Sequence, residues 1–353
     1  MCQIRIKYNS CLKFIHITPW VFSKKYFFKR SWACLYSFFK INQVIMSSVI
    51  FPGQGSQYIG MAKDFYENFK SSKYIIDEIE DYTSIPISKI IFEDNLNQLN
   101  ITQYTQICIF SASMCIFKAL EDNSNFNLSS VSFMFGHSLG EYTALAASKK
   151  INIKDASILL KKRGELMNNS VKPKLSGMAA LIGLNSKNIE NIIYENNLKV
   201  FVANDNSHQQ IVISGMIEDI NNSKKTFLDN GVKKFVLLNV SAAFHSSIML
   251  KAQNNMKEFI ENSNFKKNDI SIISNFNSEI SNDTNEIKYA LINQMANKVR
   301  WTESIITLEN SKNLNIFEIG PGKVLSGLIK RISNKFSITS INNLEDFKLI
   351  ENL

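Results

Sequence analysis

Short apolar runs alternate with longer stretches of helical periodicity along most of the chain. The runs at 48–51, 131–135, 270–274 and 316–319 are rich in Val, Ile, Met and Phe and are bounded by polar or glycine-containing turns, which is typical of fully buried strands. Between them lie longer stretches that predict helices, a mostly apolar one over 102–120 and one with helical periodicity over 155–168. Alternating strands and helices of this kind predict a parallel sheet that is covered by helices on both faces.

The pattern changes between residues 177 and 239. The order there is strand, helix, strand, strand, helix, strand, with a polar loop predicted for 204–209. This is the βαββαβ order of a ferredoxin-like unit. Because the stretches on both sides belong to one sheet, we predict that the unit is inserted into a single core, so that the chain divides into a leader (1–47), a core (48–176 and 240–340) and an inserted subdomain (177–239).

The basic charge of the chain is concentrated in the leader. The formal charge is +9, but eight of the 40 Lys and Arg lie in residues 1–48. This stretch has no acidic residue, and the first one in the chain is Asp64. The remaining 32 basic residues face 31 acidic ones, so the rest of the chain is almost neutral. A nucleic-acid-binding function therefore has no electrostatic support.

A basic, acid-free start that contains Ser and aromatic residues is typical of a targeting segment. A weak apolar stretch at 12–22 is followed by a Lys-rich stretch at 24–40, which fits a two-stage leader for a plastid-type organelle such as an apicoplast. The alternatives are a mitochondrial leader, or an extension that precedes a true start at Met46. The chain has no run of about 18 apolar residues, so we predict no membrane span.

Cysteine usage points neither to disulfides nor to a metal site. Only Cys108 and Cys115 lie outside the leader, seven residues apart on a predicted helix. Two cysteines make neither a disulfide framework nor a zinc site. We expect buried free thiols and no bound metal.

A Gly-x-Ser-x-Gly pattern occupies the junction between the predicted strand at 131–135 and a helix. Gly136 and Gly140 flank Ser138, and small residues at both positions allow a sharp turn that exposes the serine hydroxyl at the end of the strand. The following helix would direct its free N–H groups at whatever the serine attacks. The alternative interpretation is an ordinary glycine-flanked turn with an incidental serine.

A serine nucleophile needs a base, and the chain has four histidines. His16 lies in the leader, His137 is inside the elbow itself and His208 lies in a polar loop. His245 follows a small apolar stretch after a strand and is the candidate by elimination. No Asp or Glu stands at an obvious strand end between Ser138 and His245, which weakens the prediction of an esterase-type triad.

Eight short blocks, spread in order from residue 49 to about 332, carry a family resemblance. They are Phe51 to Gln57, Gly136 to Tyr142, Arg163-Gly164, Met178 to Ala180, Asn206-Ser207 with Gln210 to Gly215, Val240 to His245, Gln294 before Trp301-Thr302, and Glu318 to Lys323. In these blocks the chain resembles the malonyl-CoA:acyl-carrier-protein transacylases of type II fatty-acid synthesis. The resemblance implies an α/β-hydrolase-like core with an inserted ferredoxin-like subdomain.

The resemblance also assigns roles. It implies that Ser138 is the nucleophile that carries the malonyl group and that His245 is its base. The backbone N–H groups of Gln57 and Leu139 would form the oxyanion hole. The backbone carbonyl of Gln294 would orient His245 in place of a carboxylate.

Arg163 has two interpretations. As the last residue of a Lys-Lys-Arg run it reads as part of a solvated helix face. The resemblance instead implies that its guanidinium binds the free carboxylate of the malonyl group through two parallel N–H donors.

The resemblance implies malonyl-CoA and acyl carrier protein as partners. The sequence has no phosphate-binding glycine loop, metal-ligand cluster or nucleotide motif, so we expect no cofactor beyond the CoA substrate. We also expect a monomer. The alternatives are a serine hydrolase on the same core, a non-catalytic scaffold that binds CoA or a carrier, and a polyketide-type acyltransferase domain. The chain departs from the family pattern at Ile107, at 208–209 and at Lys298, which concerns loop shape and not the proposed catalytic residues.

Overall fold

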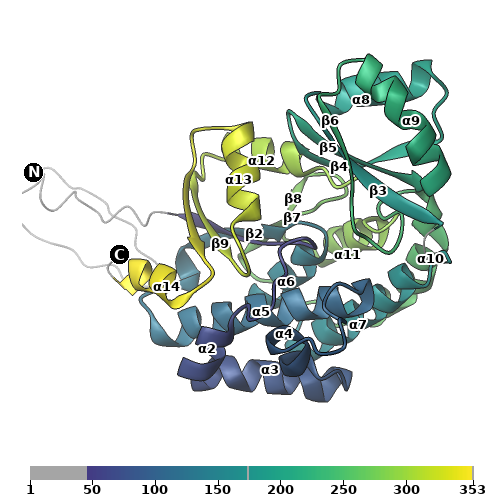
Figure 1. The fold of residues 1–353 in the computed structure, drawn as a ribbon. Helices are drawn as coiled ribbons and strands as arrows, with labels where there is room; N and C mark the ends of the chain where they lie inside the picture. The colour runs from purple at the N-terminus through teal and green to yellow at the C-terminus, as the bar shows by residue number, and fades with distance from the viewer. Residues whose placement is uncertain (1–45, 173–174, 352–353) are drawn as a thin grey trace, which may run out of the picture. The chain divides into compact units, whose positions relative to one another are not determined.

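The computed structural model describes residues 46–172 and 175–351 (Figure 1). The predicted leader at 1–47 lies almost wholly outside the described residues, so its targeting role stays a prediction. Within the described ranges, none of the helices combines the length and the apolar character that crossing a bilayer requires.

The core is built on a six-stranded sheet with the order β10-β9-β1-β2-β7-β8. Four of its five pairings are parallel, and only β7 and β8 run antiparallel. The strands are β1 (Ser47–Phe51), β2 (Val131–Gly136), β7 (Ser271–Ile273), β8 (Ile280–Ser281), β9 (Asn315–Ile319) and β10 (Ser337–Ile341). The sequence pattern missed β8, which has two residues, and β10, whose Ser-Ile-Thr-Ser-Ile sequence is half polar and partly exposed.

Successive strand residues enter two separate hydrophobic cores. Val49 and Phe51 pack into one core while Ile50 between them packs into the other, and Met134 and Phe135 are divided in the same way. This follows from the period of two along a strand. The predicted fold class, a mainly parallel sheet covered on both faces, is confirmed.

The larger core contains buried residues of most helices of the chain, and the smaller core contains those of two. Figure 1 shows the two sets on opposite faces of the sheet. The first set is α2 (Lys63–Asn68), α3 (Lys70–Thr83), α4 (Ile87–Phe92), α5 (Thr102–Asn123), α6 (Leu139–Ala147), α7 (Ile153–Asn168), α10 (Leu250–Asn262), α11 (Thr284–Asn293) and α14 (Leu344–Glu351); the second is α12 (Trp301–Asn310) and α13 (Val324–Ile332). The free thiols of Cys108 and Cys115 are buried in α5, as predicted.

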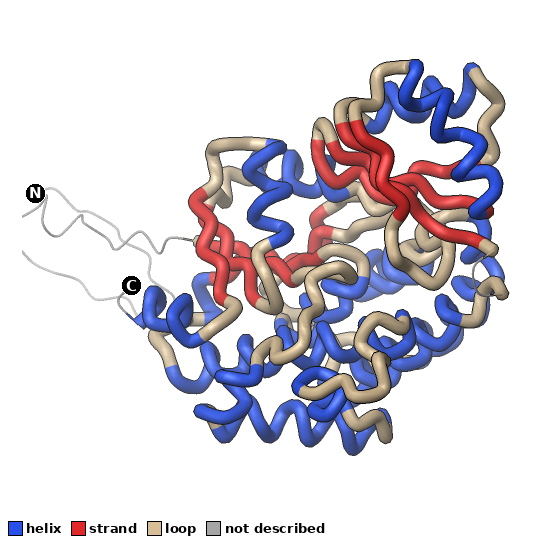
Figure 2. The backbone as a smooth tube through the Cα atoms, viewed as in Figure 1, coloured by secondary structure: helices blue, strands red, loops and turns tan. Residues whose placement is uncertain are grey.

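The predicted βαββαβ order is present as β3 (Ser176–Ile182), α8 (Ser186–Glu195), β4 (Val200–Ser207), β5 (Gln210–Met216), α9 (Ile217–Asp229) and β6 (Lys234–Leu237). These strands form a second, antiparallel sheet with the order β4-β5-β3-β6, which is separate from the first sheet (Figure 2). The two helices cover one face through Ile189, Ile220 and Phe227.

The predicted polar loop at 204–209 is wrong, because β4 continues to Ser207 and only two residues form the turn. Its polar residues join the second sheet to the core. The Asp205 N–H donates to the Val299 carbonyl at 2.9 Å, and Thr302 Oγ1 donates to Asp205 Oδ1 at 2.6 Å. Polar residues therefore occur in this strand because their partners lie on another part of the fold.

Candidate active site

Ser138 lies at the sharp turn between β2 and α6, with φ 54° and ψ −105°. Such a conformation costs a non-glycine residue on the order of 1–3 kcal/mol and persists only where the surroundings enforce it. Asn275 does so, because its Oδ1 accepts from the Ser138 N–H at 2.6 Å and its Nδ2 donates to the Gly136 carbonyl at 2.7 Å. The serine hydroxyl is thereby fixed above the carboxyl end of the sheet.

Gly136 and Gly140 are required by close approach of the backbone, as the sequence predicted. A Cβ on Gly136 would lie 2.4 Å from the Gly140 carbonyl, and one on Gly140 would lie 2.2 Å from the Phe51 carbonyl. Phe51 ends β1, which pairs with β2 beside it. The same contacts therefore bring the loop after β1 against the serine turn.

His245 is the base candidate that elimination gave, and the structure brings it to the serine. Ser138 Oγ lies 2.9 Å from His245 Nε2. On the other side of the ring, Nδ1 lies 3.1 Å from the Gln294 carbonyl and 3.2 Å from the Asn297 carbonyl. Carbonyl oxygens only accept, so the proton belongs on Nδ1 and Nε2 is left as an acceptor for the serine proton.

Burial in the protein, which is the largest cause, and the nearby Arg163 charge together lower the pKa of His245 to about 3, against the two carbonyls that raise it. The ring is therefore neutral throughout the physiological range. A neutral imidazole is the form that can accept a proton.

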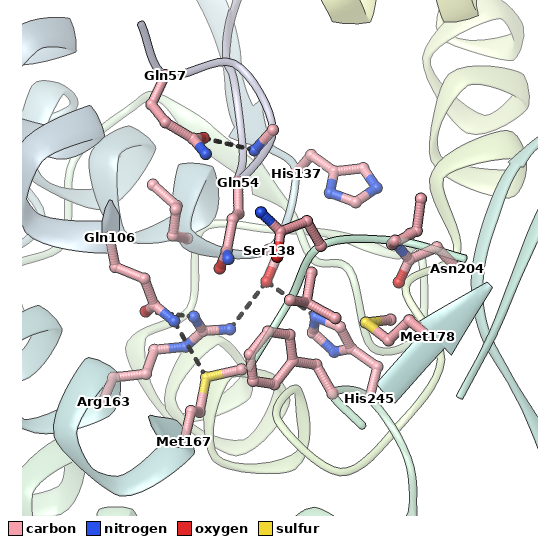
Figure 3. A pocket seen from close by; sticks show the side chains of 16 residues that line it. Gln54, Gln57, Gln106, His137, Ser138, Arg163, Met167, Met178, Asn204 and His245 are labelled. Carbon is pink, nitrogen blue, oxygen red and sulfur yellow. Dashed lines mark hydrogen bonds between the residues drawn. The ribbon is translucent and has the colours of Figure 1, made fainter. Parts of the chain in front are cut away.

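Arg163 is buried, with 1 % of its surface exposed, so its interpretation as part of a solvated face is wrong. Its NH2 group donates to Ser138 Oγ and to Gln294 Oε1, each at 2.9 Å, and NH1 donates to Gln106 Oε1 at 2.6 Å. The guanidinium carbon also lies 5.4 Å from the centre of the Tyr142 ring. Figure 3 shows Arg163 and His245 approaching Ser138 from opposite sides.

Gln294 has a second function that the sequence did not indicate. Beside presenting its carbonyl to His245, it donates from Nε2 to the Ser138 carbonyl at 2.9 Å and to Glu141 Oε2 at 2.8 Å. Glu141 also accepts from the Asn275 N–H at 3.0 Å. Its pKa is raised to about 7, chiefly by complete burial. A buried carboxylate is thus present, but it bonds to the residue behind the histidine and not to the histidine.

Gln57 and Leu139 both line the cavity at Ser138, which has a volume of about 210 Å³. The Gln57 side chain folds back on its own loop, accepting from the Gly55 N–H at 2.8 Å and donating to Asn100 Oδ1 at 3.0 Å. Leu139 is the first residue of α6, where N–H groups have no acceptor within the helix. That both N–H groups stabilise an oxyanion stays a prediction.

Three residues of the site had no role in the sequence prediction, namely Asn275, Glu141 and Gln106. Asn275 directly follows the strand predicted at 270–274, a position where polar residues commonly serve a site at the sheet edge. The other two lie in helices, and nothing in the helical periodicity distinguishes them. Asp205, an acidic residue between Ser138 and His245 in the sequence, bonds to Thr302.

The depressed pKa of His245 predicts the pH dependence of the first chemical step. We expect the rate of acyl-enzyme formation to be nearly constant from about pH 8 down to about pH 5, because the base stays unprotonated. A base with an ordinary histidine pKa would lose most of its activity by about pH 5.5. Single-turnover labelling with malonyl-CoA across this range measures the profile.

Glu141 titrates in the same range, so the control is the same profile in Glu141→Gln. A fall centred near pH 6.5 that remains in this variant would belong to the histidine and would contradict the prediction.

A serine at a strand–helix turn, a neutral histidine that accepts from it and a helix N-terminus beside a cavity together define an acyl-transfer enzyme with a serine nucleophile. Residues 49–344 match the family model described as "Acyl transferase domain". The malonyl CoA-acyl carrier protein transacylase of Bacillus subtilis is 34 % identical over 303 residues, which cover 85 % of this chain and 94 % of that protein. The chain belongs to the malonyl-CoA:acyl-carrier-protein transacylase family.

Solved structures agree. An acyl-carrier-protein S-malonyltransferase from Bartonella henselae superimposes with a TM-score of 0.82 at 35 % identity, covering 86 % of this chain and 98 % of that one. A malonyl-transacylase in complex with its type II PKS acyl-carrier protein also superimposes with a TM-score of 0.82, at 30 % identity. The match covers 87 % of this chain and 100 % of that one.

Proposed function

We propose that this protein transfers a malonyl group from CoA to the phosphopantetheine thiol of an acyl carrier protein, in fatty-acid synthesis. The observation that carries the proposal is the buried guanidinium of Arg163, 2.9 Å from the nucleophile oxygen. A buried cation beside the reacting atom selects an acyl group with a free carboxylate, because that carboxylate compensates the buried charge. The names of the relatives above support the same substrate and acceptor.

The geometry supports a two-step mechanism. Ser138 Oγ attacks the thioester carbonyl of malonyl-CoA while His245 Nε2 takes its proton, and the C–S bond breaks as His245 returns the proton to the leaving CoA thiol. The carrier thiol then gives its proton to His245 and attacks the seryl ester. Ser138 leaves and recovers the proton. Every proton is accounted for by Ser138, His245 and the two thiols, so no cofactor is needed.

The tetrahedral intermediate of each step carries an oxyanion. Backbone N–H groups at Gln57 and Leu139 are the donors that we assign to it. Removing one such donor typically costs about 2.7–4 kcal/mol of transition-state stabilisation. The Ser138 N–H is not a candidate, because it donates to Asn275.

The serine-hydrolase alternative differs only in the acceptor. None of the relatives reported above is named a hydrolase. A non-catalytic scaffold is disfavoured by the 2.9 Å contact between Ser138 and His245, which a merely binding protein does not need.

The full chain, incubated with radiolabelled malonyl-CoA and a phosphopantetheinylated acyl carrier protein, tests the proposal. We expect label to appear on the carrier in step with the release of free CoA. Without the carrier, we expect one equivalent of CoA to be released and label to stay on the enzyme. Continuous CoA release and free malonate in the absence of carrier would instead identify a hydrolase.

A further inference from the structure

All the groups that bond to the Arg163 guanidinium are neutral. In the part of the chain that the structure describes, they are the amide oxygens of Gln106 and Gln294 and the hydroxyls of Ser138 and Tyr142. Among the described residues Arg163 forms no salt bridge, and its Nε has no hydrogen-bond partner. Buried arginines are normally paired with a carboxylate, because an unpaired buried charge is costly.

The nearest carboxylate is separated from Arg163 by an amide. Glu141 Oε2 bonds to Gln294 Nε2, and Gln294 Oε1 bonds to Arg163. The negative charge therefore lies behind Gln294, where it fixes the orientation of that amide without occupying the guanidinium.

Gln106 bonds to Arg163 and to neither of the two catalytic residues, Ser138 and His245. It is 1 % exposed, and the atom that faces NH1 must be its oxygen, because a guanidinium only donates. Its Nε2 contacts Met167 Sδ at 3.2 Å, a weak acceptor. Both residues line the cavity at Ser138 (Figure 3).

An amide and a carboxylate at this position would have opposite consequences. Either one fixes the direction of the guanidinium through NH1. Only the amide leaves the positive charge uncompensated, so that a carboxylate on the acyl group is the first anion to pair with it.

We propose that Gln106 is a positioning residue that determines acyl specificity, because its neutral amide aims Arg163 at the acyl group and leaves the arginine charge available to the acyl carboxylate. This inference rests on the proposed function and deepens it. It attributes the preference for a carboxylate-bearing acyl group to the neutral residues that bond to Arg163 as well as to the arginine itself.

Two substitutions in the full chain separate charge from shape. Gln106→Glu keeps the size and the acceptor oxygen but places a carboxylate on Arg163 NH1, and Gln106→Ala removes the acceptor without adding charge. The readout is the ratio of kcat/KM for acyl-enzyme formation from malonyl-CoA to that from acetyl-CoA. Both acyl groups are measured on one preparation, so the folded fraction cancels.

We expect the malonyl-to-acetyl ratio to fall about 100-fold in Gln106→Glu, because the new carboxylate compensates the Arg163 charge. We expect it to fall about tenfold in Gln106→Ala, because only the hydrogen bond that orients the guanidinium is lost. The order of the two variants decides the inference, because a purely steric role predicts that the isosteric Glu is the milder change. A ratio that is unchanged in either variant, or a larger fall in Ala than in Glu, overturns it. If Gln106→Glu yields no folded protein, the ratio in Gln106→Ala decides alone.

Gln253→Glu is the matched control. Gln253 is also a buried glutamine, and its Oε1 accepts from the Ala296 N–H at 2.9 Å, without contact to Arg163. We expect its malonyl-to-acetyl ratio to stay at the wild-type value, and a fall as large as that of Gln106→Glu would also overturn the inference. Failure of the proposed function is distinct, because it would appear in the wild type as the absence of transfer to the carrier.

Discussion

Ser138→Ala is expected to abolish the acyl-enzyme. The Oγ atom that would carry the malonyl ester is gone, and no other hydroxyl among the described residues is bonded to His245. Loss of the nucleophile in a serine enzyme typically lowers kcat by about six orders of magnitude. The measurement is the amount of radiolabelled malonyl group that remains covalently bound after denaturation, which should fall to background.

Ser246→Ala is the matched control. This serine follows His245 directly and is buried, but its Oγ donates to the Ala243 carbonyl at 2.9 Å and not to the His245 ring. Labelling of this variant should stay near the wild-type level. Label that persists in Ser138→Ala, located by mass spectrometry of the digested protein, would show that another residue is the nucleophile.

The parts of this protein that local sequence determines could be predicted from it. The division of successive strand residues between two cores, as at Val49 and Ile50, follows from a period of two that is visible in the sequence. The serine turn has glycines where the backbone approaches too closely for a side chain. His245 could be found because so few histidines were available, not because its surroundings were visible.

The residues that were missed are those whose partners lie far along the chain. Asn275 supports a serine 137 positions away, and Gln106 bonds to an arginine 57 positions away. A contact between residues so far apart in the sequence does not change the local pattern of apolar and polar residues. The same holds for β4, whose Asp205 reads as a loop residue until its partner Thr302 is known.

Glu318 illustrates a second kind of error, in which a motif suggests a chemical role for a residue whose role is structural. It stands in a block of the family resemblance and is fully buried, which suggests chemistry. Its carboxylate instead accepts from the backbone N–H groups of Leu325 and Ser326 at 2.9 and 2.8 Å, at the start of α13. A carboxylate at a helix N-terminus stabilises the helix, so the role of this residue is structural.

Arg163→Ala is expected to impair malonyl loading far more than acetyl loading. The malonyl carboxylate would enter a buried site without its partner, and removing one member of a buried ion pair costs about 3–5 kcal/mol. This corresponds to a fall in kcat/KM for malonyl-CoA of roughly two to three and a half orders of magnitude. Acetyl-CoA has no carboxylate to pair with Arg163, so its kcat/KM should change by much less.

The neighbouring Lys162 provides the control, because it lies on the same helix with its Nζ 5.2 Å from the Phe259 ring and away from Ser138. Lys162→Ala should keep the wild-type ratio of malonyl to acetyl loading. Arg163→Lys should fall between, since a lysine keeps the charge but loses the paired N–H donors that match a carboxylate. Equal losses for both acyl groups in Arg163→Ala would mean that Arg163 serves the nucleophile through its contact with Ser138 Oγ and does not select the acyl group.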